Sequence, residues 1–505
     1  IAGHYDEAIK LSNRALETDP NNVEALSNLG NALLKSNNLI EAMSTLRRTV
    51  LLRPNDSHLI NNLGMAEQTI GLIESANQTY GEAIKIDPQC KKAENNLLLN
   101  LLNLPNQTPK SLFEVRRVCG RKYDRKENYS KKSIGHKKGN NRKIRIGYLS
   151  SDFYAHPVGF NLLPLIRNHD KEKVEISLYY LDNKFDETSK IFKSHADHWH
   201  MVIGQTDEEI ANKIKNDGID ILVSLAGRFN SNRPTVTAFR AAPIQVSFHD
   251  CSTSGLSEMD FWLTDNFLHP EDTEELFTEQ LYRLPVLYQY APPSDFPSVR
   301  SLPAKENGFI TFGCFNKPQK INEYVIALWS DILASMPYSK LFLKYGGYFN
   351  DRALIKYWED KFNQFGITED RLIFCGISGS REEHLKHYQN IDIALDPFPF
   401  NGATTTFEAL AMGVPVIALL GKNFVDRAAA SILNAAHLNN FIAHSNKEYI
   451  ELAKSLANNF DILEELRFKL REKLIGSPLC QGESYAQSIE STYQTMWKNL
   501  CSEYP

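Results

Sequence analysis

The sequence lacks the features that mark several large classes of protein. Its seven cysteines are scattered and form no CxxC pair, which excludes a disulfide framework and favours a reducing, cytoplasmic setting. The longest apolar run, near residues 414–420, is far shorter than the roughly 20 residues of a membrane span, so none is expected. A net charge of −5 over 505 residues argues against a nucleic-acid partner.

Two nucleotide-binding motifs are also missing. No GxxxxGK[ST] loop occurs, and no GxGxxG follows the first expected strand. Kinases of the first type and ordinary dehydrogenases of the second are therefore disfavoured. The start of the chain shows no signal-peptide pattern, but Ile1 already lies inside a repeat, so we expect further repeats upstream.

A period of 34 residues runs through the first hundred residues. Pro20, Pro54 and Pro88 keep this spacing. A small residue where helices touch and a proline between units are typical of the tetratricopeptide repeat, a helix–turn–helix that buries its apolar face by stacking on its neighbours. We expect such repeats over residues 1–105, where they form a protein- or peptide-binding surface without chemistry of its own. Small residues on the same grid are Ala8, Ala42 and Ala76.

Residues 106–142 connect the repeats to the rest of the chain. A helical pattern covers about 110–120, and a strongly basic stretch with few apolar residues, RKYDRKENYSKKSIGHKKGNNRK, follows it. We interpret this stretch as a solvated linker, and a nucleic-acid-binding tail is the weaker alternative.

From residue 143 the pattern changes to short β-rich runs separated by helical segments. One series fills residues 143–301 and a second fills 302–505, which predicts two consecutive α/β domains with parallel sheets. In open α/β sheets, ligands bind beyond the carboxyl ends of the strands, so the loops there should carry the chemistry. The expected strands are 144–153, 174–181, 220–227, 244–248 and 260–265, then 309–315, 340–346, 371–376, 392–398 and 414–421.

Several of these strands are followed directly by titratable side chains. In the first domain, Asp152 and His156 follow the first strand. In the second domain, cationic or titratable groups follow two strands, and they are Lys317, Lys320, Arg381 and His384. Parallel strands end at one edge of the sheet, so these groups are expected to gather there.

The stretch DPFPFNGATTTFEAL places an Asn401-Gly402 turn before three threonines at 404–406. Threonines are poor in helix interiors but suit a helix start. Free amides and hydroxyls there, with the positive end of the helix dipole, bind anions. With Lys320 and Arg381 from neighbouring strand ends, the pattern predicts a phosphate or diphosphate site. For the threonines alone, a plain capped helix is the alternative.

Five motifs follow one another along the chain: SSDFYAHPVGF, AAPIQVSFHDCSTSGLSEMDFWLTD, FNKPQKINEYVIALW, REEHLKHYQNIDIALDPFPFNGATTTFEALAMGVPV and GKNFVDRAAASIL. Together with the repeats, they resemble the protein O-GlcNAc transferases, which are inverting glycosyltransferases with two facing Rossmann-like domains, the GT-B fold. The resemblance covers nearly the whole chain and is greatest to bacterial members, which lack a long insertion between the catalytic halves. It implies that residues 143–301 form the acceptor side and residues 302–505 bind a UDP-sugar.

The resemblance implies catalytic roles for two side chains. His156 matches a histidine that faces the acceptor and the donor sugar and has been discussed as a general base. The alternative is a loop histidine that only holds the shape of its loop. Lys320 matches the lysine that neutralises the donor diphosphate as the nucleotide leaves, and the alternative is a solvated surface lysine.

Further residues match the donor site of the family. Thr404 and Thr405 correspond to threonines on the diphosphate, and Glu408 to an acid that binds the ribose hydroxyls. Arg381 and His384 correspond to positions that flank the uridine. A surface acid is the alternative for Glu408, and an ordinary helix face is the alternative for Arg381 and His384. The expected UDP-sugar site also includes Lys317, Asn401 and Gly402.

Two departures from the family pattern lie where the sugar should sit. Ala403 occupies a position that is histidine in animal members. The loop from His249 to Thr253 replaces the common Gly-Tyr-Pro-Gly-Thr form, and these two residues are candidates for contacts with the sugar or the acceptor. N-acetylglucosamine is still the leading donor sugar by the resemblance, but these departures leave glucose or another hexose open.

The resemblance implies a protein glycosyltransferase that moves a sugar from a UDP-sugar to Ser or Thr hydroxyls of an acceptor recruited by the repeats. No Asp-x-Asp pair occurs in a suitable loop, so neither a metal nor another cofactor is expected. The acceptor proton would pass to His156, to a donor phosphate oxygen or to a water chain. Transfer to an asparagine amide stays open, because the stretch DPFPF also resembles the related cytoplasmic N-glycosyltransferases. A small-molecule acceptor and a repeat scaffold with a catalytically silent domain stay open as well.

Overall fold

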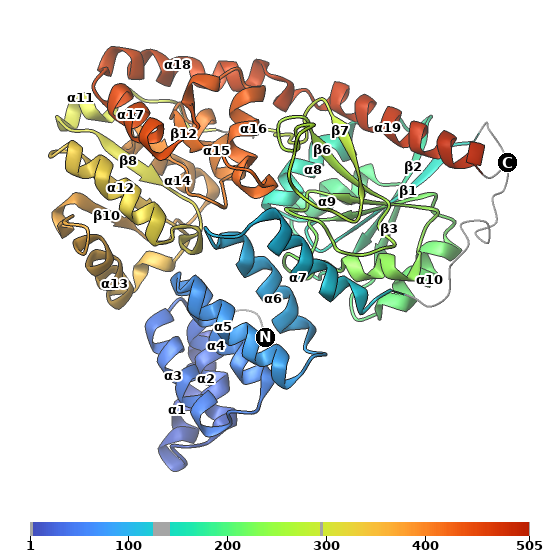
Figure 1. The fold of residues 1–505 in the computed structure, drawn as a ribbon, viewed down its shortest axis with the longest axis horizontal. Coiled ribbons are helices and arrows are strands. Elements are labelled where there is room, and N and C mark those ends of the chain that lie inside the picture. The colour runs from blue at the N-terminus through green and yellow to red at the C-terminus, as the bar shows by residue number, and fades with distance from the viewer. Residues whose placement is uncertain (1–3, 125–141, 293–295, 504–505) are drawn as a thin grey trace. The chain divides into compact units, whose positions relative to one another are not determined.

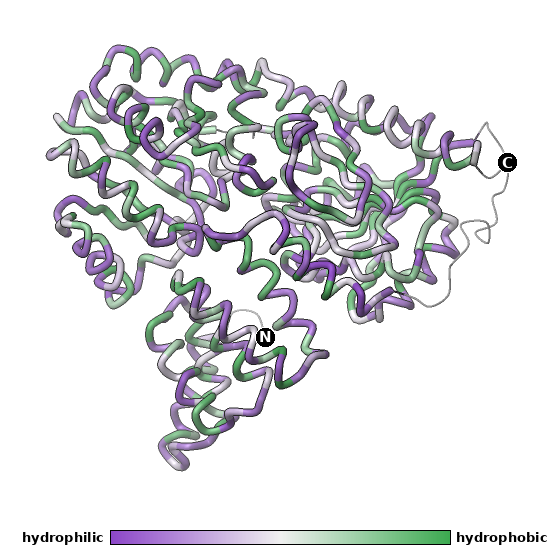
Figure 2. Tube along the Cα trace, viewed as in Figure 1, coloured by the Kyte–Doolittle hydropathy of each residue, from purple (hydrophilic) through white to green (hydrophobic). Residues whose placement is uncertain are grey.

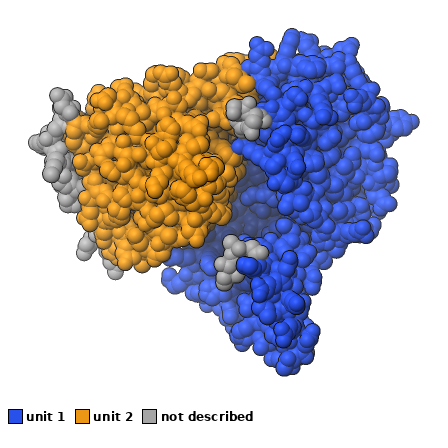
Figure 3. Space-filling view, turned by 180° about the vertical axis from the view of Figure 1, so that it is seen from behind, with its two compact units in different colours: residues 1–107, 294–421, 439–472 blue, residues 108–293, 422–438, 473–505 orange. Residues whose placement is uncertain are grey.

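The computed structural model describes residues 4–124, 142–292 and 296–503. Most of the basic stretch that we interpret as a linker lies outside this part of the chain. The described residues form two compact units, each assembled from separate stretches and coloured separately in Figure 3. These units differ from the continuous ranges expected from the sequence. Unit 1 contains residues 1–107, 294–421 and 439–472, and unit 2 contains residues 108–293, 422–438 and 473–505.

Unit 1 begins with paired antiparallel helices of the tetratricopeptide type, shown in blue in Figure 1. The small residues of the 34-residue grid lie where helices meet. Ala42 and Ala76 are fully buried, and a Cβ on Gly30 would come within 2.6 Å of Leu46 Cγ. The period therefore marks contacts between helices, as expected. The helices are α1 (Tyr5–Thr18), α2 (Val23–Lys35), α3 (Leu39–Leu52), α4 (Ser57–Ile70), α5 (Ile73–Ile86) and α6 (Lys91–Asn100).

The remainder of unit 1 is a parallel sheet with the strand order β10-β9-β8-β11-β12-β13. Strands β8 and β11 are neighbours, so the loops that follow them, 315–322 and 396–403, lie side by side. The strands are β8 (Thr311–Cys314), β9 (Lys340–Lys344), β10 (Leu372–Cys375), β11 (Ile393–Leu395), β12 (Val416–Leu419) and β13 (Ile442–Ala443). The helices are α11 (Pro303–Asn307), α12 (Glu323–Ser335), α13 (Arg352–Asn363), α14 (Arg381–Lys386), α15 (Thr404–Ala411), α17 (Asn446–Ala457) and α18 (Phe460–Gly476), the last of which continues past the unit's boundary.

Unit 2 contains a second parallel sheet, with the strand order β3-β2-β1-β4-β5-β6-β7. Every residue of β4 and β5 is buried, and Figure 2 shows hydrophobic residues along the central strands. The strands are β1 (Ile144–Ser150), β2 (Val174–Tyr180), β3 (His198–Met201), β4 (Ile221–Leu225), β5 (Ile244–Phe248), β6 (Phe261–Asp265) and β7 (Gln280–Leu284). The helices are α7 (Pro109–Arg121), α8 (Pro157–Asn168), α9 (Glu187–His195), α10 (Asp207–Asn216), α16 (Ala428–Ala435) and α19 (Gly482–Glu503).

Three observed strands were not expected from the sequence: β3, β7 and β13. Each lies at an edge of its sheet. Strands β3 and β7 are partly exposed and carry polar residues, and β13 has only two residues. An edge strand needs no continuous apolar run, so the signal that revealed the inner strands is absent from these segments.

Two segments from late in the chain complete unit 2. In α16, the Ser431 hydroxyl donates a hydrogen bond to Asp265 Oδ2 at 3.0 Å. In α19, the Tyr485 hydroxyl donates to the Leu287 carbonyl at 2.7 Å. These bonds join residues 422–438 and 473–505 to the end of β6 and to the segment just after β7, so both segments belong to unit 2 although they come late in the chain.

A buried polar network also ties α19 to the sheet. The Tyr148 hydroxyl lies 2.9 Å from His169 Nε2, and His169 Nδ1 lies 2.9 Å from Glu490 Oε1. The same oxygen accepts the Asp170 amide at 2.8 Å. Burial lowers the pKa of His169, although Glu490 acts in the opposite direction. The neutral ring then accepts from Tyr148 and donates to Glu490, so each polar atom of this network is satisfied.

No helix in the described ranges is long and apolar enough to cross a bilayer.

Replacing Glu490 with alanine should lower the free energy of unfolding by about 1–3 kcal/mol, because the His169 ring N–H and the Asp170 amide lose their shared acceptor inside the protein. Urea unfolding followed by circular dichroism measures the change. Gln487→Ala, at an exposed position of the same helix, should shift the midpoint much less. Equal shifts for the two variants would contradict the importance of the network.

Candidate active site

The Asn401-Gly402 turn lies between β11 and α15 and is held from inside by Asp396. One oxygen of this buried carboxyl, Oδ1, accepts the Gly402 amide at 2.8 Å and the Asn316 side-chain amide at 3.4 Å. A Cβ on Gly402 would approach Thr405 Oγ1 to 2.3 Å and Asp396 Oδ1 to 2.7 Å, so only glycine fits this position. Burial raises the pKa of Asp396, although the Gly402 amide and the Lys320 ammonium group lower it.

Three bonds tie the loop after β8 to the loop after β11. The first is the bond that the Asn316 side-chain amide donates to Asp396 Oδ1 at 3.4 Å. The Lys320 amine donates to the Asn401 carbonyl at 2.6 Å, and the Asn322 side chain donates to the Phe398 carbonyl at 2.8 Å. Lys320 Nζ also lies 4.1 Å from the centre of the Phe400 ring. Lys320 is therefore partly buried and held in place by its partners, unlike a lysine that extends freely into solvent.

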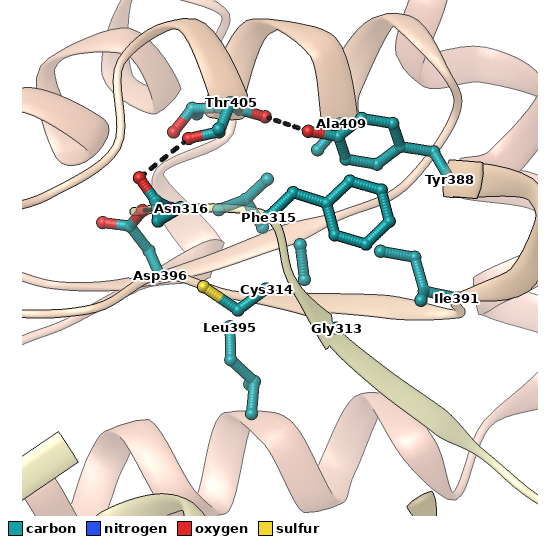
Figure 4. A pocket seen from close by; sticks show the side chains of 13 residues that line it. Gly313, Cys314, Phe315, Asn316, Tyr388, Ile391, Leu395, Asp396, Thr405 and Ala409 are labelled. Carbon is teal, nitrogen blue, oxygen red and sulfur yellow. Dashed lines mark hydrogen bonds between the residues drawn. The ribbon is translucent and has the colours of Figure 1, made fainter. Parts of the chain in front are cut away.

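The three threonines at the start of α15 differ in their surroundings. Thr404 is the first residue of the helix and is partly exposed. The Thr405 hydroxyl donates to Asn316 Oδ1 at 3.1 Å, as Figure 4 shows, and the Thr406 hydroxyl donates to the Gly402 carbonyl at 3.1 Å. An anion would thus meet the amides and the Thr404 hydroxyl first, since the other two hydroxyl hydrogens are already engaged.

The cavity drawn in Figure 4 lies beneath α15 and is lined partly by Cys314, Asn316, Asp396 and Thr405. Its volume of about 10 Å³ is close to that of one water probe. It is too small for a nucleotide sugar. A donor would therefore bind outside the start of α15 and not in the space below it.

A second cluster joins α14 to α15 around Glu408. His384 Nε2 lies 3.1 Å from Glu408 Oε2, and the Tyr388 hydroxyl donates to the same oxygen at 3.4 Å. On the other side of the ring, the Lys344 amine lies 3.0 Å from His384 Nδ1. Glu408 is only 6% exposed, so the alternative of a surface acid is wrong.

Arg381 and Lys317 border these clusters. Arg381 is the first residue of α14 and is half-buried, whereas Lys317 precedes the 3₁₀ turn Pro318–Lys320 and is exposed. Unit 1 thus brings the predicted residues of the donor site together in the loops after β8, β10 and β11.

In unit 2, His156 precedes α8 and caps its first turn. His156 Nδ1 accepts the Val158 amide at 3.3 Å, and the Asn230 side-chain nitrogen lies 3.2 Å from Nε2. A neutral imidazole has one ring lone pair, so it can accept only one of these two N–H groups. Asp152 Oδ1 lies 3.6 Å from Nδ1, and Asp152 is itself held by the side chains of Asn230 and Asn232. His156 therefore both shapes its loop and sits beside a buried carboxylate.

The loop after β5 contains the predicted contacts to the sugar or acceptor. His249 is buried in a left-handed conformation, with φ of 53°, and burial lowers its pKa to about 3. Within the described residues, its Nε2 has no hydrogen-bond partner. The Thr253 hydroxyl donates to the buried Glu279 at 2.6 Å, so a sugar would compete with this carboxylate for it.

The residues that hold the loops in place were not predicted from the sequence: Asn316, Asn322, Lys344, Tyr388 and Asp396. Asn316 and Asp396 also stand at strand ends, so the rule that selected Lys320 and His156 would have selected them. Their supporting role depends on contacts between residues far apart in the sequence, which no local pattern reveals.

Tetratricopeptide helices followed by two parallel α/β sheets define the class of repeat-bearing glycosyltransferases with the GT-B fold. The family model for glycosyl transferase family 41 matches residues 120–290 and 298–489, and tetratricopeptide repeat models match residues 1–63 and 57–90. The chain belongs to glycosyl transferase family 41.

Named relatives agree with this assignment. The probable UDP-N-acetylglucosamine–peptide N-acetylglucosaminyltransferase SPINDLY of Arabidopsis thaliana is 33% identical over 424 residues, which cover 83% of this chain and 46% of the relative. The corresponding transferase of Caenorhabditis elegans is 24% identical over 485 residues, which cover 72% of this chain and 42% of the relative. The chain thus spans less than half the length of these relatives.

A solved structure matches the whole chain. A lysine-to-methionine mutant of the Thermobaculum terrenum O-GlcNAc transferase superposes with a TM-score of 0.92 at 30% identity, covering 100% of this chain and 96% of that one. The likeness includes the repeats as well as both α/β sheets.

The raised pKa of Asp396 gives a prediction for stability. At pH values between the ordinary pKa of 3.8 and the raised native pKa, the native carboxyl holds a proton that the unfolded chain has released. The free energy of unfolding should therefore fall as pH rises above about 4, by at most about 1.4 kcal/mol per pH unit from this group. Asp396→Asn preserves an uncharged acceptor and should flatten the dependence between about pH 5 and pH 8. Urea unfolding of both proteins across this range measures it, and identical slopes would contradict the shift.

Proposed function

We propose that this protein is an inverting glycosyltransferase that transfers N-acetylglucosamine from UDP-N-acetylglucosamine to Ser or Thr hydroxyls of a protein. The observation that carries the proposal is the fixed pairing of the Lys320 amine with the start of α15 across the Asn401-Gly402 turn. The similarity to UDP-N-acetylglucosamine–peptide N-acetylglucosaminyltransferases and to an O-GlcNAc transferase supports this donor and this acceptor class.

The pairing suits departure of a diphosphate. In an inverting displacement, a hydroxyl attacks the anomeric carbon and negative charge develops on the leaving UDP. The amides at the start of α15, the Thr404 hydroxyl and the Lys320 ammonium group are already oriented, so they stabilise this charge with little reorganisation. We propose that these groups take the part that a metal ion takes in other transferases.

The uridine and ribose are proposed to bind beside α14. Arg381 and His384 border this region, and the Glu408 carboxylate would exchange its bond with His384 or Tyr388 for a ribose hydroxyl. The repeats are proposed to recruit the acceptor. None of the seven cysteines forms a disulfide, which supports action in the reducing cytoplasm.

Incubation of the full chain with single nucleotide sugars and a lysate tests the proposal. Intact-mass analysis should show a gain of one N-acetylhexosamine on acceptor proteins with UDP-N-acetylglucosamine, and chelation of metals should not abolish it. A gain from UDP-glucose or another donor would correct the sugar. Release of UDP without protein modification would favour a small-molecule acceptor, and absence of UDP binding would favour a silent scaffold.

Lys320→Met should lower kcat by about 100- to 1,000-fold, because the leaving diphosphate loses a preorganised positive charge. UDP release with saturating donor measures this, and circular dichroism checks the fold. Lys447→Met, at an exposed position on α17, is the matched control and should retain the rate. Near-full turnover by Lys320→Met would remove this lysine from the mechanism.

The pH profile tests His156 as the general base. As a base, Nε2 must be free of a proton, which requires Nδ1 to carry one toward Asp152 and to give up its bond from the Val158 amide. His156→Ala should then lower kcat by about 100-fold or more and abolish the acid limb of the profile, since that limb reports the imidazole. A variant that keeps the limb would assign proton removal to a donor phosphate oxygen or to water.

A further inference from the structure

The repeats of unit 1 make a buried hydrogen bond with its α/β sheet. Helix α4 ends at Ile70, and the Tyr348 hydroxyl donates to the Ile70 carbonyl at 3.1 Å. The Trp358 ring nitrogen in turn donates to the Tyr348 hydroxyl at 3.3 Å. Both aromatic side chains are almost fully buried, at 3% and 1% exposure, so this is a packed contact.

The same end of α4 also reaches the turn that carries Lys320. Gly71 caps the helix with φ of 97°, and a Cβ there would lie 3.8 Å from the Pro318 carbonyl oxygen and 3.9 Å from Trp358 Cζ2. Pro318 is the buried first residue of the 3₁₀ turn that ends at Lys320. The end of α4 thus lies next to the backbone two residues before the lysine, close enough for a side chain at Gly71 to touch it.

A second contact lies one repeat earlier. A Cβ on Gly347 would come within 2.9 Å of the Asn37 side-chain nitrogen, in the turn between α2 and α3. Gly347 directly precedes Tyr348, so both contacts act on the same short segment. Two successive repeats therefore approach this segment, and the end of α4 lies next to both the segment and the turn that carries Lys320.

We propose that Tyr348 and Trp358, seated on the end of α4, are positioning residues for Lys320. Through them the repeats support the chemistry on the donor as well as recruit the acceptor. A charge placed for a leaving group is effective only when its location is held within a fraction of an ångström, and packing of neighbouring side chains provides that hold. The inference rests on the proposed function.

The test measures UDP release from UDP-N-acetylglucosamine by the full chain with no protein acceptor present. Under this condition a surface that only recruits acceptors has no effect on the rate. Tyr348→Phe removes the bond to Ile70 and leaves the Trp358 N–H without its acceptor. Gly347→Val inserts a side chain between the segment and Asn37. The control is Tyr80→Phe, which deletes an equally buried hydroxyl within the repeats, where it donates to Gln68 at 2.9 Å.

The two variants at the junction between the repeats and the sheet, Tyr348→Phe and Gly347→Val, should lower kcat by about 3- to 10-fold with little change in KM. Tyr80→Phe should retain the wild-type rate. Thermal unfolding shows whether the three variants lose similar stability, which separates positioning from a general loss of fold. Junction variants with unchanged kcat, or a Tyr80→Phe rate that falls equally, would overturn this inference and leave the proposed function standing. A wild-type chain that neither binds UDP nor releases it from any donor would overturn the proposed function and this inference with it.

Discussion

The part of unit 1 that we propose binds the donor is arranged around the hydrogen bond between the Lys320 ammonium group and the Asn401 carbonyl. A charge-assisted bond of 2.6 Å at a partly buried position is stronger than a neutral one, and it joins loops from two neighbouring strands. The bonds from Asn316 and Asn322 flank it on either side. The protein's own hydrogen bonds therefore hold the amine and the start of α15 at a fixed separation, which is what preorganisation requires.

The buried carboxyl of Asp396 has to support this arrangement without opposing it. An ionised carboxylate close to the start of α15 would repel the diphosphate that we propose binds there. Burial raises the pKa of Asp396 and so favours the neutral acid, which still accepts the Gly402 amide. The same carboxyl thus fixes the turn and leaves the local positive potential of the helix end largely intact.

The parts of the molecule that are encoded locally could be predicted from the sequence. The 34-residue period and the β-branched runs repeat over short distances, so the repeats and the inner strands were found. Edge strands such as β3 have no such pattern. Lys320 was selected because loops after strands carry chemistry, and Glu408 was selected through the resemblance to the family; both lie in segments that follow strands of the sheet in unit 1. Their supports were not found, because Asn316 and Asp396 are 80 residues apart in the sequence and Tyr348 and Ile70 are 278 apart.

The network at the C-terminal helix has a consequence for biosynthesis. His169 and Glu490 are separated by 321 residues, so the ribosome must add all of these residues before the histidine can meet its carboxylate. Until α19 emerges, the side of the sheet that this helix covers stays exposed, and a nascent sheet with uncovered apolar surface is prone to association.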